Sequence, residues 1–473
     1  MIPGVAKQAP GRVHLLGICG TGMASLAGML HDKGYRVSGS DQNTYPPMSE
    51  MLASLGIPVH SSYRPENLAA DLDLVVVGNA ISRGNPELEE VLDRRLPLVS
   101  MPVILRELFL RGHWSVVVAG THGKTTTASL LSWVLASAGR DPSFLVGGIP
   151  LDFGKSYHFG EGECFVIEGD EYDTAYFDKG PKFLHYIPDT VVLGNVEYDH
   201  ADIYPDLDSV ATAFRRLTNL IPRRGSLVVG AASPLALEVS QGAFCRVESF
   251  AVEGDADWQA RRVCVDKSGS RFEVWRQGAC CGELAGPFWG QAALSNALAV
   301  VAAGDHLGLG FEEMADGLKS FRGVARRLEA RGEARGVIVV DDFAHHPTAI
   351  RETIRSARLR WPGRKLWAVF EPRSFTARSR VFEDALPSAL GEADAVVLAA
   401  VFSSSRLAAD QELSEEHVVE ELRGARTDAW FLPAVDEIVS FLNKSVGPGD
   451  VVLGMSNGAF GGFHRKLLEA LGS

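Results

Sequence analysis

The sequence predicts an α/β protein of three consecutive domains, each built on a mainly parallel sheet. Short apolar runs alternate with helical stretches along nearly the whole chain, and polar residues follow where the apolar runs end. Buried parallel strands have this pattern because helices cover both faces of their sheet. The chain of 473 residues is also too long for one ordinary core. We therefore expect ligands at the carboxyl ends of the strands, where open parallel sheets bind them.

The apolar runs also set the expected domain limits. The first domain covers residues 1–112 and contains VHLLG and LDLVVVGNA. The second covers 113–322 and contains HWSVVVAG, CFVIEGD, TVVLGNVEYDH and GSLVVG. Within it, residues 244–289 alternate in polarity and have few helix formers, which predicts a small antiparallel insert. The third domain covers 323–473, with runs such as GVIVVDDFAHH, KLWAVFEP and DVVLGMSNGAFGG.

Composition and charge argue against several classes of function. The net charge of −13 disfavours binding to nucleic acid. We find no apolar run of about 18 residues, the length of a membrane span, and no signal peptide. The six cysteines are scattered without a CxxC pair, which indicates reduced thiols and argues against a zinc site. We therefore expect a cytoplasmic protein that binds neither nucleic acid nor a membrane, and the sequence leaves its oligomeric state open.

A turn rich in glycine and threonine follows the first strand of the second domain, in VVVAGTHGKTTTASLL, residues 116–131. Backbone N–H groups of such a turn, together with the start of the next helix, bind phosphates. Lys124 would reach the terminal phosphates and Thr125 would bind Mg²⁺. Val118 stands where the strict pattern has its first glycine, and the alternative is a simple turn with an exposed lysine. The predicted phosphate-binding residues are Gly120, Thr121, His122, Gly123, Lys124, Thr125 and Thr126.

A second glycine-rich turn, GICGTG at residues 17–22, follows the first strand of the chain. Its pattern is GxxGxG, whereas dinucleotide sites usually have GxGxxG. Asp41 ends the next strand region, where an acidic side chain can bind a ribose hydroxyl. By itself, this turn is as consistent with tight packing as with a nucleotide or dinucleotide site.

Two acidic clusters follow strands of the second domain. EGDEYDTAYFDK begins with Glu168, at the end of an apolar strand, and NVEYDHADIY contains Glu197 and His200. Carboxylate and imidazole groups beside a triphosphate suit a second Mg²⁺ or Mn²⁺ ion. For each of these acidic residues, the alternative is a solvated charge on a loop. Glu168 and His200 are the stronger candidates because each comes just past an apolar strand.

At this point the chain resembles the Mur ligase family, the ATP-dependent amide-forming enzymes of peptidoglycan synthesis. The resemblance rests on AGTHGKTTT, EGDEYDTAYFDK, NVEYDHADIY, FRGVARRLE, DDFAHHPTAI and MSNGAFGG, in the family's order and spacing. It implies a Rossmann-like UDP-binding domain, a P-loop ATPase domain and a Rossmann-like C-terminal domain. GNAISRGNP, EYDTAYFDK and EPRS resemble the branch that joins a murein tripeptide, L-alanyl-γ-D-glutamyl-meso-diaminopimelate, to UDP-N-acetylmuramate in peptidoglycan recycling. The alternative is the sister branch, which adds free L-alanine during de novo synthesis.

The resemblance implies roles for the residues of the second domain. Lys124 would bind the β- and γ-phosphates of ATP, and Thr125 a first Mg²⁺. Glu168 and His200 would hold a second Mg²⁺, which Mn²⁺ can replace, and no carbamylated lysine is expected. A carboxylate would attack the γ-phosphate, and an amine would displace phosphate from the resulting acyl phosphate. Both steps concentrate negative charge, so we expect catalysis by positioning and charge neutralisation.

The resemblance also implies the remaining ligand contacts. The residues that would hold the UDP moiety are Gly20, Thr21, Gly22, Asp41, Asn79 and Ala80. Near adenine the family often has GxHNxxN, and here residues 290–296 read GQAALSN, so Asn296 is kept while Ala292 and Ala293 replace the usual histidine and asparagine. Adenine recognition is therefore expected to be looser or supplied elsewhere. A helix-surface amide is the alternative for Asn296.

In the third domain, Arg326, Arg327, Asp342, His345 and His346 match family positions that line the cleft for ATP and tripeptide. Arg327 and Asp342 are assigned to ATP, and both histidines to the peptide. Further peptide-binding candidates are Arg373, Ser456 and Asn457. Arg373 can pair with a peptide carboxylate, and the glycine-rich turn after Asn457 allows close approach of the backbone. Surface charge and simple turn packing are the alternatives.

Two other classes of function leave parts of the sequence unexplained. An NAD-dependent oxidoreductase would use the first glycine-rich turn, but would not need Gly-Lys-Thr or the acidic clusters. A non-catalytic nucleotide-binding protein would not need Glu168 and His200 together. The ligase reading accounts for all of these motifs.

Overall fold

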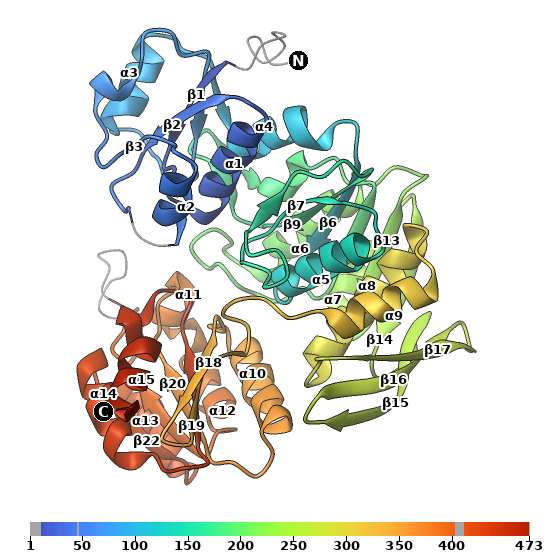
Figure 1. The fold of residues 1–473 in the computed structure, drawn as a ribbon, viewed down its shortest axis with the longest axis vertical. Helices are drawn as coiled ribbons and strands as arrows, with labels where there is room; N and C mark the ends of the chain where they lie inside the picture. Colours follow the sequence, from blue (N-terminus) through green and yellow to red (C-terminus); the bar gives the residue numbers. More distant parts are fainter. Residues whose placement is uncertain (1–10, 45–46, 403–410, 473) are drawn as a thin grey trace.

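The computed structural model describes residues 11–44, 47–402 and 411–472. The chain folds into three α/β domains, as the sequence predicts (Figure 1). In this view the N-terminal domain lies at the top, the central domain at the right and the C-terminal domain at the lower left. Clusters of buried hydrophobic side chains lie on both faces of each main sheet.

The N-terminal domain is built on a parallel sheet in the order β3-β2-β1-β4-β5. Its strands are β1 (Arg12–Leu16), β2 (Arg36–Ser40), β3 (Val59–His60), β4 (Leu74–Val77) and β5 (Leu98–Ser100). Its helices are α1 (Thr21–Asp32), α2 (Met48–Ser54), η1 (Pro65–Asn67), α3 (Pro86–Asp93), α4 (Met101–Leu105) and η2 (Arg106–Leu110). The chain leaves β1 toward β2 on one side and later returns to β4 on the other. The turn after β1 therefore lies where the strand order reverses, the usual ligand position in such sheets.

The central domain contains a mixed sheet in the order β17-β16-β15-β14-β13-β12-β6-β9-β7-β8. Its strands are β6 (Trp114–Ala119), β7 (Ser143–Leu145), β8 (Tyr157–His158), β9 (Cys164–Gly169), β12 (Thr190–Leu193), β13 (Ser226–Gly230), β14 (Arg246–Ala251), β15 (Trp258–Asp266), β16 (Gly269–Arg276) and β17 (Ala279–Gly286). A separate hairpin pairs β10 (Asp173–Ala175) with β11 (Asp178–Pro181). The helices are α5 (Lys124–Ser137), η3 (Lys182–His185), α6 (Leu207–Thr218), α7 (Pro234–Ser240), α8 (Gln291–His306) and α9 (Phe311–Ser320).

Strand β6 lies inside this sheet, between β12 and β9, and is buried on both faces. Val116 and Val118 belong to the hydrophobic cluster that contains α5, α8 and α9, while Val117 and Ala119 belong to the cluster on the opposite face. Val118, which replaces the first glycine of the strict phosphate-loop pattern, is therefore a core residue. The loop after Ala119 starts from a rigid strand.

The predicted insert is an extension of the central sheet, and only part of it is antiparallel. β15, β16 and β17 pair antiparallel, as expected. β14 instead pairs parallel with β13, so antiparallel pairing was the wrong prediction for Arg246–Ala251. Alternating polarity indicates a half-exposed strand but does not report the direction of its partner.

The C-terminal domain is built on a sheet in the order β18-β19-β23-β20-β21-β22, in which only the β18–β19 pair is antiparallel. Its strands are β18 (Glu329–Ala334), β19 (Val337–Asp342), β20 (Leu366–Phe370), β21 (Ala395–Leu398), β22 (Asp428–Phe431) and β23 (Val451–Met455). Its helices are α10 (Pro347–Arg360), α11 (Phe375–Arg378), η4 (Arg380–Phe382), α12 (Ala385–Leu390), α13 (Glu415–Gly424), α14 (Val435–Ser445), η5 (Phe460–Gly462) and α15 (Phe463–Gly472). One face packs against α10, α12 and α13, and the other against α14 and α15.

The central and C-terminal domains meet where the start of α8 faces α10. The guanidinium of Arg360 lies 4.4 Å from the ring centre of Trp289 and 4.7 Å from that of Trp361. Gly290, with φ of 87°, lies so close to Ser356 that a β-carbon would be 2.5 Å from the serine Oγ. The contact of Arg360 with Trp289 and a close backbone approach therefore join these two domains.

The N-terminal and central domains are joined by α1 and the β8 region. Ser25 on α1 and Ser156 share a hydrogen bond of 2.7 Å between their hydroxyls. At Gly28 an added β-carbon would lie 2.3 Å from the Tyr157 hydroxyl, so the absence of a side chain there permits this contact.

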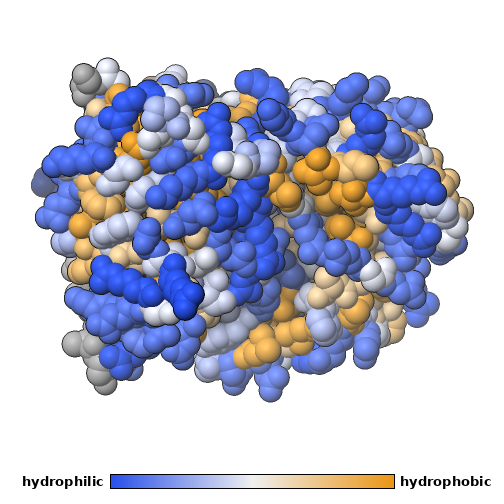
Figure 2. Space-filling view, turned by 90° about the horizontal axis from the view of Figure 1, so that it is seen from below, coloured by the Kyte–Doolittle hydropathy of each residue, from blue (hydrophilic) through white to orange (hydrophobic). Residues whose placement is uncertain are grey.

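The surface is mainly hydrophilic on the face seen from below. Hydrophilic side chains run as a band down its middle, and the hydrophobic areas on either side are small (Figure 2). No helix among the described residues is long and apolar enough to cross a membrane.

Candidate active site

The predicted phosphate loop occupies the carboxyl end of β6. Gly120 and Gly123 have φ of 126° and 81°, which only glycine adopts readily. A β-carbon would lie 2.8 Å from the Asn195 carbonyl oxygen at Gly120, and 2.7 Å from Asn296 Oδ1 at Gly123. The loop is therefore packed against the end of β12 and against α8, where Asn296 lies beside Gly123, and its predicted contact with adenine stays a prediction. His122 N donates to Asn195 Oδ1 at 2.8 Å, which adds a second tie to the same segment.

Lys124, the first residue of α5, is held by a buried carboxylate. Its Nζ donates to both Glu171 oxygens, at 2.9 and 2.8 Å, and to the Gly120 carbonyl at 2.7 Å. Burial alone would lower the pKa of Lys124, but Glu171 and Asp170 outweigh it and raise the pKa. The ammonium is therefore charged and already directed into the loop. Thr126 follows within the first turn of α5.

Thr125 and Glu168 lie together beside Lys124. The threonine Oγ1 donates to Glu168 Oε1 at 2.8 Å, and Gly147 N donates to Glu168 Oε2 at 2.6 Å. Arg327, from the C-terminal domain, donates to the same threonine oxygen at 3.4 Å. A hydroxyl and a carboxylate oxygen side by side form a donor set that suits Mg²⁺. The residues present therefore fit one such ion at this position.

His200 contacts Glu171, the carboxylate that also holds Lys124. Its Nε2 is 3.0 Å from Glu171 Oε1. Burial alone would lower the pKa of His200, but Glu171 and Asp199 raise it. Its φ of 57° is unusual for a residue with a side chain, so its backbone is strained. Within the described part of the chain no hydrogen bond joins His200 to Glu168, and their shared metal role stays a prediction.

Glu171 was not singled out from the sequence, although it lies in the predicted acidic cluster. Its side chain is only 4% exposed and bonds both Lys124 and His200. Its pKa is lowered because these cations outweigh the effect of burial. The only signal in the sequence was its position two residues past the end of a buried strand.

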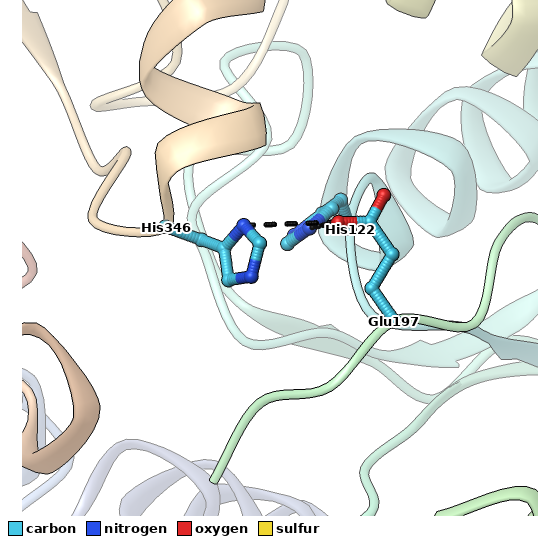
Figure 3. Close-up of side chains that lie close together, drawn as sticks. All are labelled: His122, Glu197 and His346. Carbon is cyan, nitrogen blue, oxygen red and sulfur yellow. Dashed lines mark ion pairs between the residues drawn. The ribbon is translucent and has the colours of Figure 1, made fainter. Parts of the chain in front are cut away.

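Three more side chains converge from different segments beside the loop, as Figure 3 shows. His122 Nε2 lies 3.5 Å and His346 Nδ1 lies 3.9 Å from the same oxygen, Oε2 of Glu197. The centres of the two imidazole rings are 4.4 Å apart. His346 precedes α10 and caps it, accepting a hydrogen bond from Thr348 N at 3.2 Å. The structure thus places His346 at the phosphate loop, and its predicted contact with a peptide stays a prediction.

The other predicted residues near β19 are tied mainly to their own domain. Asp342 accepts hydrogen bonds from Leu328 N and Ala344 N, at 2.6 and 2.8 Å, and burial raises its pKa. Arg326 donates to the carbonyls of Ser456 and Gly458, at 2.6 and 2.5 Å. These contacts hold the loops that follow β19 and β23.

His345 lies in the loop between β19 and α10. Burial lowers its pKa to about 4, so the imidazole is neutral near pH 7. One ring nitrogen lies 3.1 Å from the Phe343 carbonyl oxygen.

Arg373, Ser456 and Asn457 form a second group at the carboxyl ends of β20 and β23. The Arg373 guanidinium lies 3.7 Å from the ring centre of Phe402. Ser456 Oγ donates to Glu371 Oε2 at 2.5 Å. Asn457 Oδ1 is buried without a hydrogen-bond partner among the described residues. Arg373 thus lies on an aromatic ring and Asn457 has an unpaired amide oxygen, and the predicted contact of these residues with a peptide stays a prediction.

The residues predicted to hold UDP are brought together by the order of the first sheet. Gly20 precedes α1, and Thr21 and Gly22 begin this helix. Asp41 accepts from Cys19 N and Asn43 N, both at 2.9 Å, and so ties the turn after β1 to the loop after β2. Asn79 and Ala80 follow the neighbouring strand β4 and are exposed. The turns after adjacent strands thus form one edge that is open to a ligand.

Comparison with known protein families matches all three domains. Residues 12–113 match the model described as Mur ligase family, catalytic domain, residues 118–304 match the Mur ligase middle domain, and residues 326–458 match the Mur ligase, glutamate ligase domain.

Individual relatives match over nearly the whole chain. UDP-N-acetylmuramate–L-alanyl-γ-D-glutamyl-meso-2,6-diaminoheptandioate ligase of Escherichia coli strain K12 is 41% identical over 97% of this chain and 98% of its own. The crystal structure of a murein peptide ligase from Psychrobacter arcticus 273-4 has 35% identity and a TM-score of 0.75, covering 98% of this chain and 99% of its own. UDP-N-acetylmuramate-alanine ligase from Thermotoga maritima has 25% identity and a TM-score of 0.81, covering 97% and 98%. With this coverage by family models and relatives, the chain belongs to the Mur ligase family.

Proposed function

We propose that the protein is an ATP-dependent ligase that joins L-alanyl-γ-D-glutamyl-meso-diaminopimelate to the carboxylate of UDP-N-acetylmuramate. One observation carries this proposal: the phosphate loop lies between two domains. Thr125 contacts Arg327, and His122 contacts His346, across the boundary. A ligase needs this arrangement because its nucleotide, its carboxylate and its amine must meet at one point.

The buried charges beside the loop supply what the first half-reaction needs. As the muramyl carboxylate attacks the γ-phosphate of ATP, charge builds on the phosphate oxygens. Lys124 can release Glu171 and neutralise this charge, and Glu171 remains paired with His200. Thr125 and Glu168 would hold Mg²⁺, which supplies further charge neutralisation, and Mn²⁺ can replace it. His200 is assigned, with Glu168, to a second ion.

The proposal assigns the remaining contacts by domain. The nucleotide is held by the loop and by side chains around it, namely Gly120, Thr121, His122, Gly123, Lys124, Thr125, Thr126, Asn296, Arg327 and Asp342. The UDP moiety lies at the edge formed by Gly20, Thr21, Gly22, Asp41, Asn79 and Ala80. The proposed domain limits are 1–112, 113–322 and 323–473. Each boundary falls in the chain segment between the last strand of one main sheet and the first strand of the next.

The choice of tripeptide rests on the relatives and on the C-terminal domain. Sequence identity favours relatives named for the tripeptide, whereas the T. maritima L-alanine ligase has the higher TM-score. We give identity more weight, because a TM-score over several domains also depends on how the domains are oriented. Arg373 on Phe402 and the free Asn457 oxygen offer contacts to the distal part of a peptide, which L-alanine does not have. We place the reaction in the bacterial cytoplasm.

The test is ADP release by the purified protein with ATP, Mg²⁺ and UDP-N-acetylmuramate, and with L-alanine, tripeptide or tetrapeptide as the amine. Tripeptide should support rapid ADP release together with the ligated product, and L-alanine should not. Efficient use of L-alanine without turnover of tripeptide would assign the chain to the sister activity.

A further inference from the structure

We propose that His122, Glu197 and His346 form a binding site for a zinc-like divalent cation, separate from the residues assigned to Mg²⁺. His122 belongs to the phosphate loop, Glu197 to the segment after β12, and His346 to the start of α10 (Figure 3). One potential ligand atom from each side chain lies within 4.8 Å of the others. No other group of three such side chains with this spacing occurs among the described residues.

The three donor atoms face a common point. Glu197 Oε2 is the shared neighbour, 3.5 Å from His122 Nε2 and 3.9 Å from His346 Nδ1. Zinc holds nitrogen and oxygen ligands at about 2.0 to 2.2 Å, so ligands at tetrahedral angles lie slightly more than 3 Å apart. Side-chain movements of less than about 1 Å would therefore bring the donors to this spacing, with a fourth position left for water or a ligand.

The burial of His122 Nε2 and of the His346 side chain also supports a metal site here. Nε2 of His122 is buried and has no hydrogen-bond partner among the described residues. A buried polar atom without a partner is costly, and a metal ion is one group that satisfies it. The side chain of His346 is only 7% exposed. The site is thus partly buried, with His346 inside, His122 17% exposed and Glu197 36% exposed toward solvent.

The donor types suit a zinc-like ion. A carboxylate with two imidazoles is a zinc ligand set, whereas Mg²⁺ prefers oxygen ligands. The sequence argument against zinc rested only on cysteine spacing.

Thr348 supports this geometry from α10. Its hydroxyl donates to Glu197 Oε2 at 2.8 Å, and its backbone N donates to His346 Nδ1 at 3.2 Å. Metal binding would replace the longer bond, from Thr348 N to His346 Nδ1. The bond from the Thr348 hydroxyl would keep the Glu197 carboxylate oriented. Because two ligands come from the central domain and one from the C-terminal domain, a bound ion would fix the two domains relative to each other beside the phosphate loop. The site is then a regulatory one, at which zinc holds the cleft in one arrangement.

Zinc binding to the full chain tests the proposal without reference to ligase activity. The background carries Cys264→Ser, Cys280→Ser and Cys281→Ser, since these exposed thiols would bind zinc themselves. Equilibrium dialysis with Zn²⁺ in excess Mg²⁺ then gives stoichiometry and affinity. We expect one Zn²⁺ per chain, and a loss of affinity of about 100-fold or more in Glu197→Gln or His346→Asn, since even outer partners of a ligand contribute about 10- to 100-fold.

The variants are chosen to keep the fold. Glutamine retains an acceptor for Thr348, and asparagine is a good helix cap. His31→Asn, which removes an exposed histidine at the end of α1, is the matched control and should bind zinc like the background. Equal zinc affinity in all of these proteins, or no zinc bound in the background, would overturn the proposal.

Co²⁺ provides a measurement that needs no ligand variant. In the cysteine-replaced background, Co²⁺ should give the intense visible absorption of a four- or five-coordinate site. The weak spectrum of six-coordinate Co²⁺ alone would also overturn the proposal.

Discussion

Replacing Lys124 by methionine separates the two roles of its buried ammonium, in stability and in catalysis. Glu171 is 4% exposed and is bonded by Lys124 through both oxygens. Removing one partner of a buried ion pair typically costs about 3 to 5 kcal/mol, because the other charge is left unpaired. His200 still contacts Glu171, so we expect a value at the lower end, about 3 kcal/mol. The rate of ligation should fall by about 100-fold or more, the scale for losing one charge-neutralising group in a transition state.

A second substitution distinguishes these effects. Glu171→Gln in the Lys124→Met protein removes the unpaired charge, so it should recover most of the lost free energy of unfolding, but not the lost rate. Urea unfolding followed by circular dichroism measures the first quantity, and ADP release under saturating substrates measures the second. If Lys124→Met is as stable as the wild type, or if the double variant is no more stable than the single one, the ion pair is not the stabilising contact described here. Recovery of the rate in the double variant would refute the role of Lys124 in catalysis.

Three further predictions follow from the site. Glu168→Gln and His200→Asn should each slow single-turnover ADP formation by about 100-fold or more while leaving ATP affinity nearly unchanged, because they act on the metal rather than on the nucleotide; weakened ATP binding with an intact chemical step would contradict this. Arg373→Ala should raise the tripeptide KM by about 10- to 100-fold with the KM of ATP unchanged, and an unchanged tripeptide KM would remove Arg373 from the peptide site. The pKa of His346 is lowered from 6.5 to about 4, so its contribution to stability is complete above pH 6.5 and is lost as pH falls toward 4. As pH falls from 6.5 to about 4, the free energy of unfolding, measured with urea, should decrease by about 2 to 3 kcal/mol more in the wild type than in His346→Asn. An equal decrease in both proteins would refute the shift in pKa.

The sequence was informative about features that depend on residues close together in the chain. Polar motifs at the ends of apolar runs proved to follow strands, among them the glycine-rich turn after β6 and both acidic clusters. Strand direction was less accessible. Arg246–Ala251 reads like its antiparallel neighbours because its polarity alternates, yet it pairs parallel with β13. The difference depends on the path of the chain through α7, which no local pattern encodes.

Contacts between distant segments account for what was missed in the site. Glu171 is one of several acids in its cluster, and only the fold shows that it faces Lys124, which is 47 residues away in the chain. His346 was assigned to the peptide from its match to a family position. The structure directs its side chain across the domain boundary to His122. A motif identifies a strand end, but the rotation of each side chain there is decided by the packing of the other domain.

The position of Arg360 between Trp289 and Trp361 has a consequence for experiments on domain movement. The two indoles belong to different domains and share one guanidinium. If the C-terminal domain swings away from the central domain, the contact of Arg360 with Trp289 separates, and the Trp289 ring meets more water. Indole fluorescence shifts to longer wavelength in water, so the unlabelled chain contains an optical reporter of its own opening, one that substrates and metal ions can be titrated against.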